Sequence, residues 1–536
     1  MRRPKALLSS ILKVVLAGLY FLIVIGPMLA LLVGLRAVPA SDWGRLVLPT
    51  ERQLRLWLRS IGLAASVSIA AMGLGVLIAL MLQRWEARLA NLRWAVVLLA
   101  PLPSMTHAMA WSWLMNTLNR TLARVGLRPL AFQGWLAAWW IQMLWLAPIA
   151  IGLALIALDS IDRELIEAAR LLQPDIRTLK RVMLPLAAPL LLAGGGLIFL
   201  LSLVDYTIPS LCQVNVTALD IFADFSVHNQ PGRALLVSMP LLATTTVVLI
   251  LSQAQLRPLA LDPNWHRADS GLSYHWHAGF RIFLYVALVV MALAVSVPAI
   301  SLVAQVDGFR ELTLTLSEAR AEIAFSLLIG LLSAALSLPI AFAAARGALS
   351  SGPSRRVWWL AITVPMALPG PLVGIGLITL WNQPGWGGLG IYGSRWMPVL
   401  AALARYTPLG ALVLIAGMRR INSRLLDAAR MLETSRLRTW LLVRLPLLAP
   451  GLLASAGLVF CLTLSELSAT LLVAPPGQST LTLRLYNYLH YGASETVAGF
   501  TLVLTGLVLA FALLAAIALA LWTRLTTVSQ AKESRP

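Results

Sequence analysis

Charge is scarce in this sequence. Only 12% of the 536 residues are charged, 59% are hydrophobic, and the mean hydropathy is +0.82. A water-soluble protein rarely has so few charges, so a lipid bilayer is the expected solvent for most of the chain. Among the charged residue types lysine is the rarest, with four among the 42 basic residues. Because the arginines fall between apolar runs, the net charge of +20 indicates control of membrane topology and argues against nucleic-acid binding.

Cysteine is sparse and catalytic motifs are missing. The two cysteines, Cys212 and Cys461, belong to no CxxC or CxxH pattern, which argues against a disulfide framework and against a cysteine metal site. The sequence contains no HExxH, no GxSxG and no phosphate-binding GxxxxGK[ST] loop. We therefore expect a non-enzymatic chain with no metal, cofactor or ATPase site of its own.

Long apolar runs fill most of the chain. A helix needs about 20 apolar residues to cross the hydrocarbon core of a bilayer, where it satisfies its own backbone hydrogen bonds. By this measure the sequence predicts an all-α integral membrane protein with 12 transmembrane helices. The predicted spans are 14–35, 60–83, 93–115, 133–158, 186–208, 233–253, 280–304, 322–345, 357–381, 396–418, 448–472 and 498–522.

The arginines and lysines favour one orientation of these spans. With the N-terminus in the cytoplasm, the cytoplasmic segments hold 28 of the 42 basic residues, the outer segments hold 13, and Arg405 lies within a span. Cytoplasmic loops of membrane proteins carry such an excess. The bias predicts that both chain ends are cytoplasmic.

One charged stretch occurs twice. EAARLLQPDIRTLKRVMLP covers residues 167–185, and DAARMLETSRLRTWLLVRLP covers residues 427–446. Each copy follows a proline by nineteen residues and precedes an acidic residue at the end of the next predicted span, Asp205 or Glu466. The shared surroundings indicate a duplication. We expect two parallel six-span repeats, residues 1–253 and 280–536, joined by a cytoplasmic linker at 254–279.

Each charged stretch predicts a short helix outside the membrane. In the first copy, Leu165, Ala168 and Leu172 fall on one helical face, and Pro174 ends the helix. The Leu-Pro pair at the end of each copy is expected to mark where the chain turns back into the next span. Such a helix could lie on lipid. Its narrow apolar face, without Trp or Phe, favours a groove on a partner protein.

At these residues the sequence resembles the permease subunits of bacterial ABC importers, in the branch with the type I layout. The Glu-Ala-Ala triplet followed by Leu-Pro is similar to the cytoplasmic coupling loop of that family. The resemblance implies a bacterial inner-membrane subunit whose two loops, about 160–185 and 420–446, dock two copies of an ABC ATPase subunit. That partner would bind ATP and Mg, a periplasmic or extracellular solute-binding protein would deliver the solute, and membrane lipid would surround the chain.

The resemblance assigns coupling roles residue by residue. The fused double permease and the segment RLYNYLHYG at 484–492 are most similar to the iron(III) and thiamine uptake branch. Two positions depart from the family, because Gln173 and Glu433 stand where it usually has the glycine of the turn. The first copy is also one residue shorter, and the second begins with Asp. The assigned coupling residues are Glu167, Ala168, Ala169, Gln173, Leu184 and Pro185 in the first loop, and Asp427, Ala428, Ala429, Glu433, Leu445 and Pro446 in the second.

Three ionisable residues are candidates for the translocation path: Arg405, Asp205 and Glu466. A charge near the bilayer centre costs about 3 kcal/mol, so each is a functional candidate. Arg405 could line the path, or it could pair with Glu466 and hold two spans together.

Two other functions stay open from sequence alone. An ion-gradient-driven secondary transporter would use the same three charges as a relay, and a membrane scaffold or sensor would transport nothing. The solute also stays open among iron(III), thiamine, a polyamine and an oxyanion.

Overall fold

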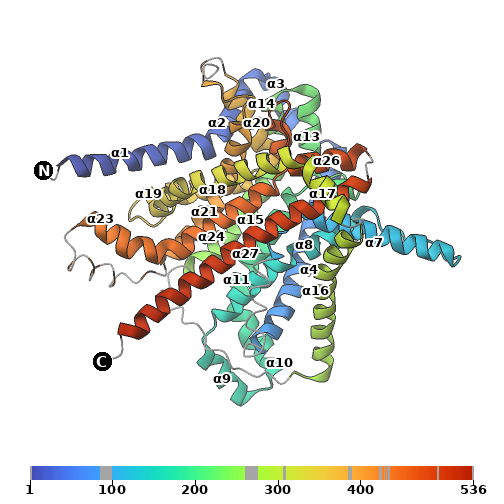
Figure 1. The fold of residues 1–536 in the computed structure, drawn as a ribbon, viewed down its shortest axis with the longest axis horizontal. Coiled ribbons are helices and arrows are strands. Elements are labelled where there is room, and N and C mark those ends of the chain that lie inside the picture. The colour runs from blue at the N-terminus through green and yellow to red at the C-terminus, as the bar shows by residue number, and fades with distance from the viewer. Residues whose placement is uncertain are drawn as a thin grey trace.

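A computed structural model gives the fold. It describes residues 3–84, 99–259, 276–305, 309–383, 385, 389–419, 421, 425, 427, 429, 431, 435–491 and 494–533. Within these ranges the chain forms helices and no β-strand. Figure 1 shows long helices crossing at oblique angles, with shorter helices at both ends of the bundle. The all-α fold class is therefore confirmed for the described part of the chain.

The first half of the chain contributes these elements in order: α1 (Arg3–Tyr20), η1 (Phe21–Ile25), α2 (Gly26–Gly34), η2 (Leu35–Ala37), α3 (Ala40–Val47), α4 (Glu51–Arg84), α7 (Ser104–Arg124), α8 (Gly134–Asp159), α9 (Arg163–Leu172), α10 (Asp175–Thr178), η3 (Leu179–Met183), α11 (Leu184–Val204), α12 (Thr207–Leu211), α13 (Thr217–His228), α14 (Pro231–Val237) and α15 (Met239–Leu259).

The second half continues with α16 (Ala278–Ala304), α17 (Phe309–Glu318), α18 (Arg320–Ala348), α19 (Ser354–Thr363), η4 (Val364–Ala367), α20 (Gly370–Trp381), α21 (Trp396–Arg419), α23 (Arg436–Thr439), η6 (Trp440–Arg444), α24 (Leu445–Leu464), α25 (Thr470–Val473), α26 (Leu481–Tyr491) and α27 (Ser494–Glu533). In Figure 1 the two chain ends, α9, α10 and α23 lie toward the left and lower part of the view, and α3, α13, α14 and α26 lie toward the top and upper right.

Nine helices of the described residues are long and apolar enough to cross a membrane, and two bent helix pairs raise the number to eleven. Each of these overlaps one of the twelve predicted spans. The remaining prediction, 93–115, falls partly on residues outside the described ranges and partly on α7. The structure thus supports nine to eleven spans and does not establish twelve.

Two predicted spans are broken helices and not straight ones. The span predicted at 357–381 bends by 110° between Ala367 and Gly370, and the one at 233–253 bends by 59° at Ser238. The first break coincides with Pro365, Pro369 and Pro371. Proline has no backbone N–H and clashes with the preceding turn, so closely spaced prolines end a helix. The bend sets the N-terminus of α20 inside the bundle.

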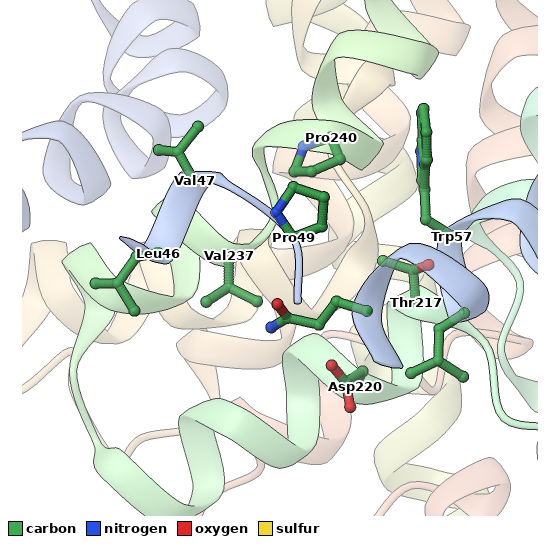
Figure 2. A pocket seen from close by; sticks show the side chains of 10 residues that line it. Leu46, Val47, Pro49, Trp57, Thr217, Asp220, Val237 and Pro240 are labelled. Carbon is green, nitrogen blue, oxygen red and sulfur yellow. The ribbon is translucent and has the colours of Figure 1, made fainter. Parts of the chain in front are cut away.

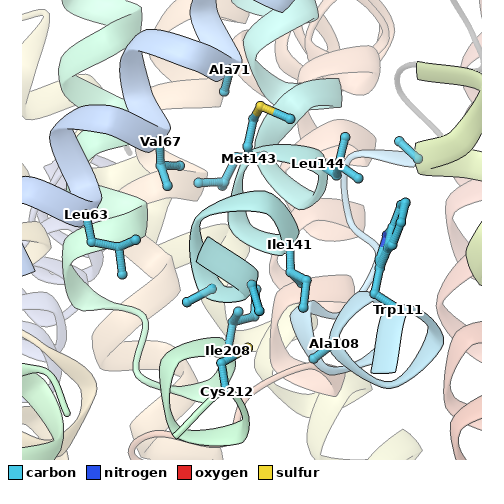
Figure 3. Packing of buried hydrophobic residues seen from close by; sticks show 14 of the residues in the cluster. Leu63, Val67, Ala71, Ala108, Trp111, Ile141, Met143, Leu144, Ile208 and Cys212 are labelled. Carbon is cyan, nitrogen blue, oxygen red and sulfur yellow. The ribbon is translucent and has the colours of Figure 1, made fainter. Parts of the chain in front are cut away.

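Helix α8 lies at the centre of the first half. It packs against α4, α7 and α11, and 72% of its most apolar window is buried, more than in any other of the nine candidate spans. Figure 3 shows this packing, with Ile141, Met143 and Leu144 of α8 among side chains of α4, α7 and α12. The corresponding helix of the second half, α21, is the next most buried at 67%. Polar groups on α8 and α21 therefore lie deep in the protein.

The close approach of α2 and α20 gives a stability prediction. A Cβ at Gly376 of α20 would lie 2.5 Å from the Pro27 carbonyl oxygen of α2, whereas a Cβ at Gly506 of α27 would meet nothing within 4 Å. Gly376→Ala should lower the free energy of unfolding by about 1–3 kcal/mol, because the two backbones must separate. The matched Gly506→Ala change should leave stability unchanged or slightly raised. Thermal unfolding of the purified chain measures both, and equal midpoints for the two variants would contradict this packing.

Candidate functional site

The first charged loop folds as the predicted short helix. Helix α9 begins after Asp162, whose carboxylate accepts a hydrogen bond from the Glu164 backbone N–H at 3.0 Å. It ends at Leu172, directly before Gln173 and Pro174. Gln173 is extended, with φ −155° and ψ 154°. Because this turn does not use a left-handed conformation, glutamine fits where the family usually has glycine.

The outward face of α9 is apolar and exposed. Ile166 packs into the protein and is 4% exposed, whereas Leu165 is 53% exposed and Leu171 and Leu172 are each 88% exposed. Ala168 is exposed beside them. A face of this kind on a short helix is suited to insertion into a groove on another protein.

Two ion pairs hold charged residues of α9. Glu167 is exposed and accepts a hydrogen bond from Arg163 Nε at 2.8 Å. Arg170 Nε donates to Asp175 at 2.7 Å, which ties the end of α9 to the start of α10. Ala169 is half-buried. The second pair is partly buried, so it stiffens the loop more than an exposed pair would.

The second charged loop shows the same exposure where it is described. Leu425 is 53% exposed and Met431 is 88% exposed, matching Leu165 and Leu171 at an offset of 260 residues. Asp427 is exposed and Ala429 is half-buried. The predicted coupling residues Ala428 and Glu433 lie outside the described residues.

The segment after each loop corrects one expectation. A four-residue helix, a five-residue π-helix and a long helix starting with Leu-Pro follow in both copies, as α10, η3 and α11 and as α23, η6 and α24. The Leu184 N–H donates to the Leu179 carbonyl, and the Leu445 N–H donates to the Trp440 carbonyl, five residues back in each case.

The prediction that the Leu-Pro pairs mark a turn is therefore wrong. Pro185 and Pro446 lie within continuous helical rods that begin at Asp175 in the first copy and at Arg436 in the second. The π-helical turn accommodates the proline, which has no N–H to donate. The chain reverses earlier, between Leu172 and Pro174 in the first copy. Helix α10 is thus continuous with α11 through η3.

A buried polar cluster lies on α21 and the segment after α24. Arg405 forms an ion pair with Glu466, and their side chains are 18% and 2% exposed. The Tyr406 hydroxyl donates to the same Glu466 oxygen, Oε2. The other oxygen, Oε1, accepts the Ala469 backbone N–H at 2.7 Å. The structure thus contains the Arg405–Glu466 pair, one of the two interpretations of Arg405, and it joins α21 to the end of α24.

Asp205 holds the matching position in the first half but has different partners. Its carboxylate accepts hydrogen bonds from Gln142 Nε2 at 3.0 Å and from the backbone N–H groups of Thr207 and Ile208 at 3.1 and 3.4 Å. Asp205 therefore caps α12, as Glu466 does for the segment before α25. Asp205 and Glu466 each follow a long helix and stabilise the start of a short one.

Tyr206 directly follows Asp205 in the chain. Its side chain is fully buried, and its hydroxyl has no hydrogen-bond partner among the described residues. Of the three predicted path residues, the structure brings Arg405 and Glu466 into direct contact.

Sequence reasoning missed Tyr206, Tyr406 and Gln142. Tyr206 and Tyr406 each follow a residue that was identified, Asp205 or Arg405, so a search of the neighbours of intramembrane charges would have found them. Gln142 carried a weaker signal, a lone amide within an apolar span. Its Oε1 accepts a hydrogen bond from the Ser202 hydroxyl at 2.8 Å, so it joins α8 to α11.

The other features of the described residues offer no comparable site. One small pocket lies between the α3–α4 connection, α13 and the α14–α15 bend, lined by Trp57, Thr217 and Asp220 among others (Figure 2). Its volume of about 10 Å³ suits one water molecule and not a solute. In the part of the chain that is described, no group of three or more His, Cys, Asp and Glu could hold a metal ion.

Comparison with known proteins gives the class of protein for the second half. Residues 337–528 match the family of the binding-protein-dependent transport system inner membrane component. This segment is just over a third of the chain and contains Arg405, the second charged loop and Glu466. The match supports a membrane permease of an ABC importer.

Particular relatives point the same way. PhnV of Salmonella typhimurium, named as a 2-aminoethylphosphonate transport system permease protein, is 30% identical over 156 residues, which are 28% of this chain and 57% of PhnV. PotI of Escherichia coli K12, named as a putrescine transport system permease protein, is 22% identical over 151 residues, 27% of this chain and 53% of PotI. The aligned part spans a little over half the length of these two relatives. None of these names includes iron or thiamine.

Proposed function

We propose that this chain is the membrane-spanning subunit of an ATP-driven ABC importer in the bacterial inner membrane. It passes a small solute from an external binding protein to the cytoplasm. A separate ATPase binds ATP and Mg and supplies the driving force through the two charged loops. The observation that carries the proposal is the match of residues 337–528 to the inner membrane component of binding-protein-dependent transport systems.

A hydrogen bond that occurs at equivalent places in both halves supports extending the permease role from the second half to the whole chain. The Thr217 N–H donates to Ser60 Oγ at 3.0 Å, and the Leu481 N–H donates to Ser326 Oγ at 2.8 Å. In each case the first residue of a short helix, α13 or α26, bonds to a serine of a long one, α4 or α18. We propose two repeats of six spans, residues 1–253 and 280–536, with a span at 93–115 completing the first.

The exposed faces of the two charged loops fit the docking of two ATPase copies. Leu171 and Met431 present equal exposure at matching positions, and the segments that begin at Asp175 and Arg436 run without a break in helical structure into α11 and α24. A push on the loop would therefore displace α11 or α24 as a rod. In this proposal both chain ends and both loops are cytoplasmic.

The solute we propose is a small molecule with a primary ammonium group. The relatives are named for 2-aminoethylphosphonate and putrescine, and both of these molecules carry such a group. The buried carboxylates Asp205 and Glu466 are suitable acceptors for it. Iron(III) and thiamine, expected from the overall layout, have no support from these relatives.

Cysteine crosslinking tests the docking of the ATPase. Both native cysteines, Cys212 and Cys461, are buried, so reagents should react mainly with introduced ones. Leu171→Cys and Met431→Cys are expected to crosslink to the co-purifying ATPase. Ile166→Cys, on the same helix but 4% exposed, is the matched control and should not. Absence of crosslinks from both exposed sites in an assembled complex would contradict the proposal.

A further inference from the structure

The short helices α13 and α26 dock on long helices through the same kind of backbone contact. Helix α13 packs against α4, and α26 packs against α18. The first residue of each short helix, Thr217 or Leu481, donates its N–H to a serine hydroxyl of the long helix, Ser60 or Ser326. Because both bonds join a backbone N–H to a serine, neither can distinguish the long helix of its own half from that of the other half.

An ion pair accompanies each contact, and the two pairs have opposite polarity. In the first half, Arg52 Nη2 of α4 lies 2.6 Å from Asp220 Oδ1 of α13. In the second half, Arg484 Nη1 of α26 lies 2.6 Å from Glu322 Oε1 of α18. Asp220 and Arg484 are each the fourth residue of the short helix. The short helix therefore carries the negative charge in the first half and the positive charge in the second.

Exchange of the two short helices would bring like charges together. Glu318 and Glu322 precede the docking serine of α18 by eight and four residues, so α13 docked there would place Asp220 beside carboxylates. Arg52 precedes the docking serine of α4 by eight residues, so α26 docked there would place Arg484 beside a guanidinium. Like charges at a packing surface are strongly unfavourable. Helix α13 also packs against α20 of the second half, so the two halves lie close together at this helix.

The charge of Arg484 is not explained by helix preference. The first turn of a helix favours acidic residues, because the helix dipole is positive there. Asp220 agrees with this preference and Arg484 opposes it. Arg484 Nη2 donates to the Tyr488 hydroxyl at 2.9 Å, and its guanidinium lies 4.9 Å from the centre of the Phe500 ring. These contacts hold an arginine at an unfavourable helix position, where its charge is opposite to that of Glu322.

We propose that these inverted ion pairs, Arg52 with Asp220 and Arg484 with Glu322, determine which short helix docks on which long helix. In a chain built from two similar halves, they keep α13 on α4 and α26 on α18, both within one chain and between neighbouring copies. The proposal rests on the two-repeat organisation proposed above and not on the solute or the energy source. The second pair contributes more, because its side chains are 24% and 17% exposed whereas Arg52 is 76% exposed.

Disulfide trapping in isolated membranes tests this pairing on the full-length chain. Ser60→Cys with Thr217→Cys reports correct docking, since the two hydroxyl oxygens lie 3.2 Å apart. Ser326→Cys with Thr217→Cys reports exchanged docking. The native cysteines, Cys212 and Cys461, are buried. Mass spectrometry of the disulfide-linked peptides measures both products, and with the reporter cysteines alone only the correct disulfide should form.

The decisive variant is Arg52→Glu with Asp220→Arg. It keeps an attractive pair in the first half but gives both halves the same polarity. The exchanged disulfide should rise at least about tenfold, because the repulsion against exchange is gone. A pair that acts only as a local bridge predicts no exchanged disulfide. The matched control is Arg163→Glu with Glu167→Arg, which inverts a pair within α9 and should leave the exchanged disulfide at background.

A neutral variant decides the question if the inverted one does not yield monodisperse protein. Arg52→Gln with Asp220→Asn removes attraction and repulsion without creating a new charge. The exchanged disulfide should then rise by a smaller factor, about threefold. An exchanged disulfide at background in either monodisperse variant would overturn the proposal. ATP-driven uptake by the unaltered chain does not depend on this result, so the importer function would still stand.

Discussion

Glu466→Ala is expected to cost about 3–5 kcal/mol of stability, a larger loss than Gly376→Ala should cause. The change removes the carboxylate that accepts hydrogen bonds from Arg405, Tyr406 and the Ala469 N–H. Arg405 would then be a buried charge with no partner, next to the positive N-terminus of α20. The measurement is the yield of monodisperse protein after detergent extraction, together with its thermal midpoint.

Two control variants distinguish a stability loss caused by breaking the ion pair from a general sensitivity of the chain to mutation. Removing Arg405 and Glu466 together, as methionines, should restore most of the lost stability, because no uncompensated charge remains. Glu51→Ala breaks a pair with Arg55 whose side chains are 83% and 65% exposed, and it should change stability by less than about 0.5 kcal/mol. A Glu466→Ala protein as stable as the unaltered chain would show that the pair is not structural.

Leu171→Asp combined with Met431→Asp should reduce solute uptake at least about tenfold while the chain still folds. Both side chains are 88% exposed, so a charge there costs little in the isolated subunit. At an interface, a buried apolar anchor typically contributes about 2 kcal/mol or more. A carboxylate in its place should weaken ATPase docking at both loops. Uptake and ATPase activity of the reconstituted complex are the readouts.

The control for this experiment is Val227→Asp on α13. Val227 is 78% exposed, so the change is chemically matched, and helix α13, which carries it, lies at the opposite end of the view from α9 (Figure 1). Uptake should stay near the unaltered level. Normal coupled uptake in the double variant would show that these faces do not hold the ATPase.

Sequence patterns predicted the features that depend on local composition. Apolar runs located eleven of the helices or bent pairs that can cross a membrane, and Pro174 located the end of α9. The pair of Arg405 and Glu466 was one of two interpretations of a charge inside a span. A charged side chain buried in an apolar environment almost always needs a partner. The sequence shows such a charge within an apolar run, so it also shows that a partner is required.

Other features depend on how helices pack and could not be read from one sequence. Single prolines at 148 and 408 stay within helices α8 and α21, whereas those at 365–371 coincide with a 110° break. Tertiary contacts decide between a tolerated proline and a broken span. The hydrogen bond between Thr106 and Thr505 likewise requires the two halves of the chain to meet, and no local sequence pattern predicts it.

The most direct test of the central claim is to identify the energy source that drives solute uptake. The measurement is uptake of radiolabelled 2-aminoethylphosphonate into proteoliposomes that contain the chain with its ATPase and its binding protein. We predict that uptake requires ATP on the ATPase side and is unchanged when ionophores collapse the ion gradients. Uptake that continues without ATP and stops when the gradients collapse would contradict the account and identify an ion-driven transporter.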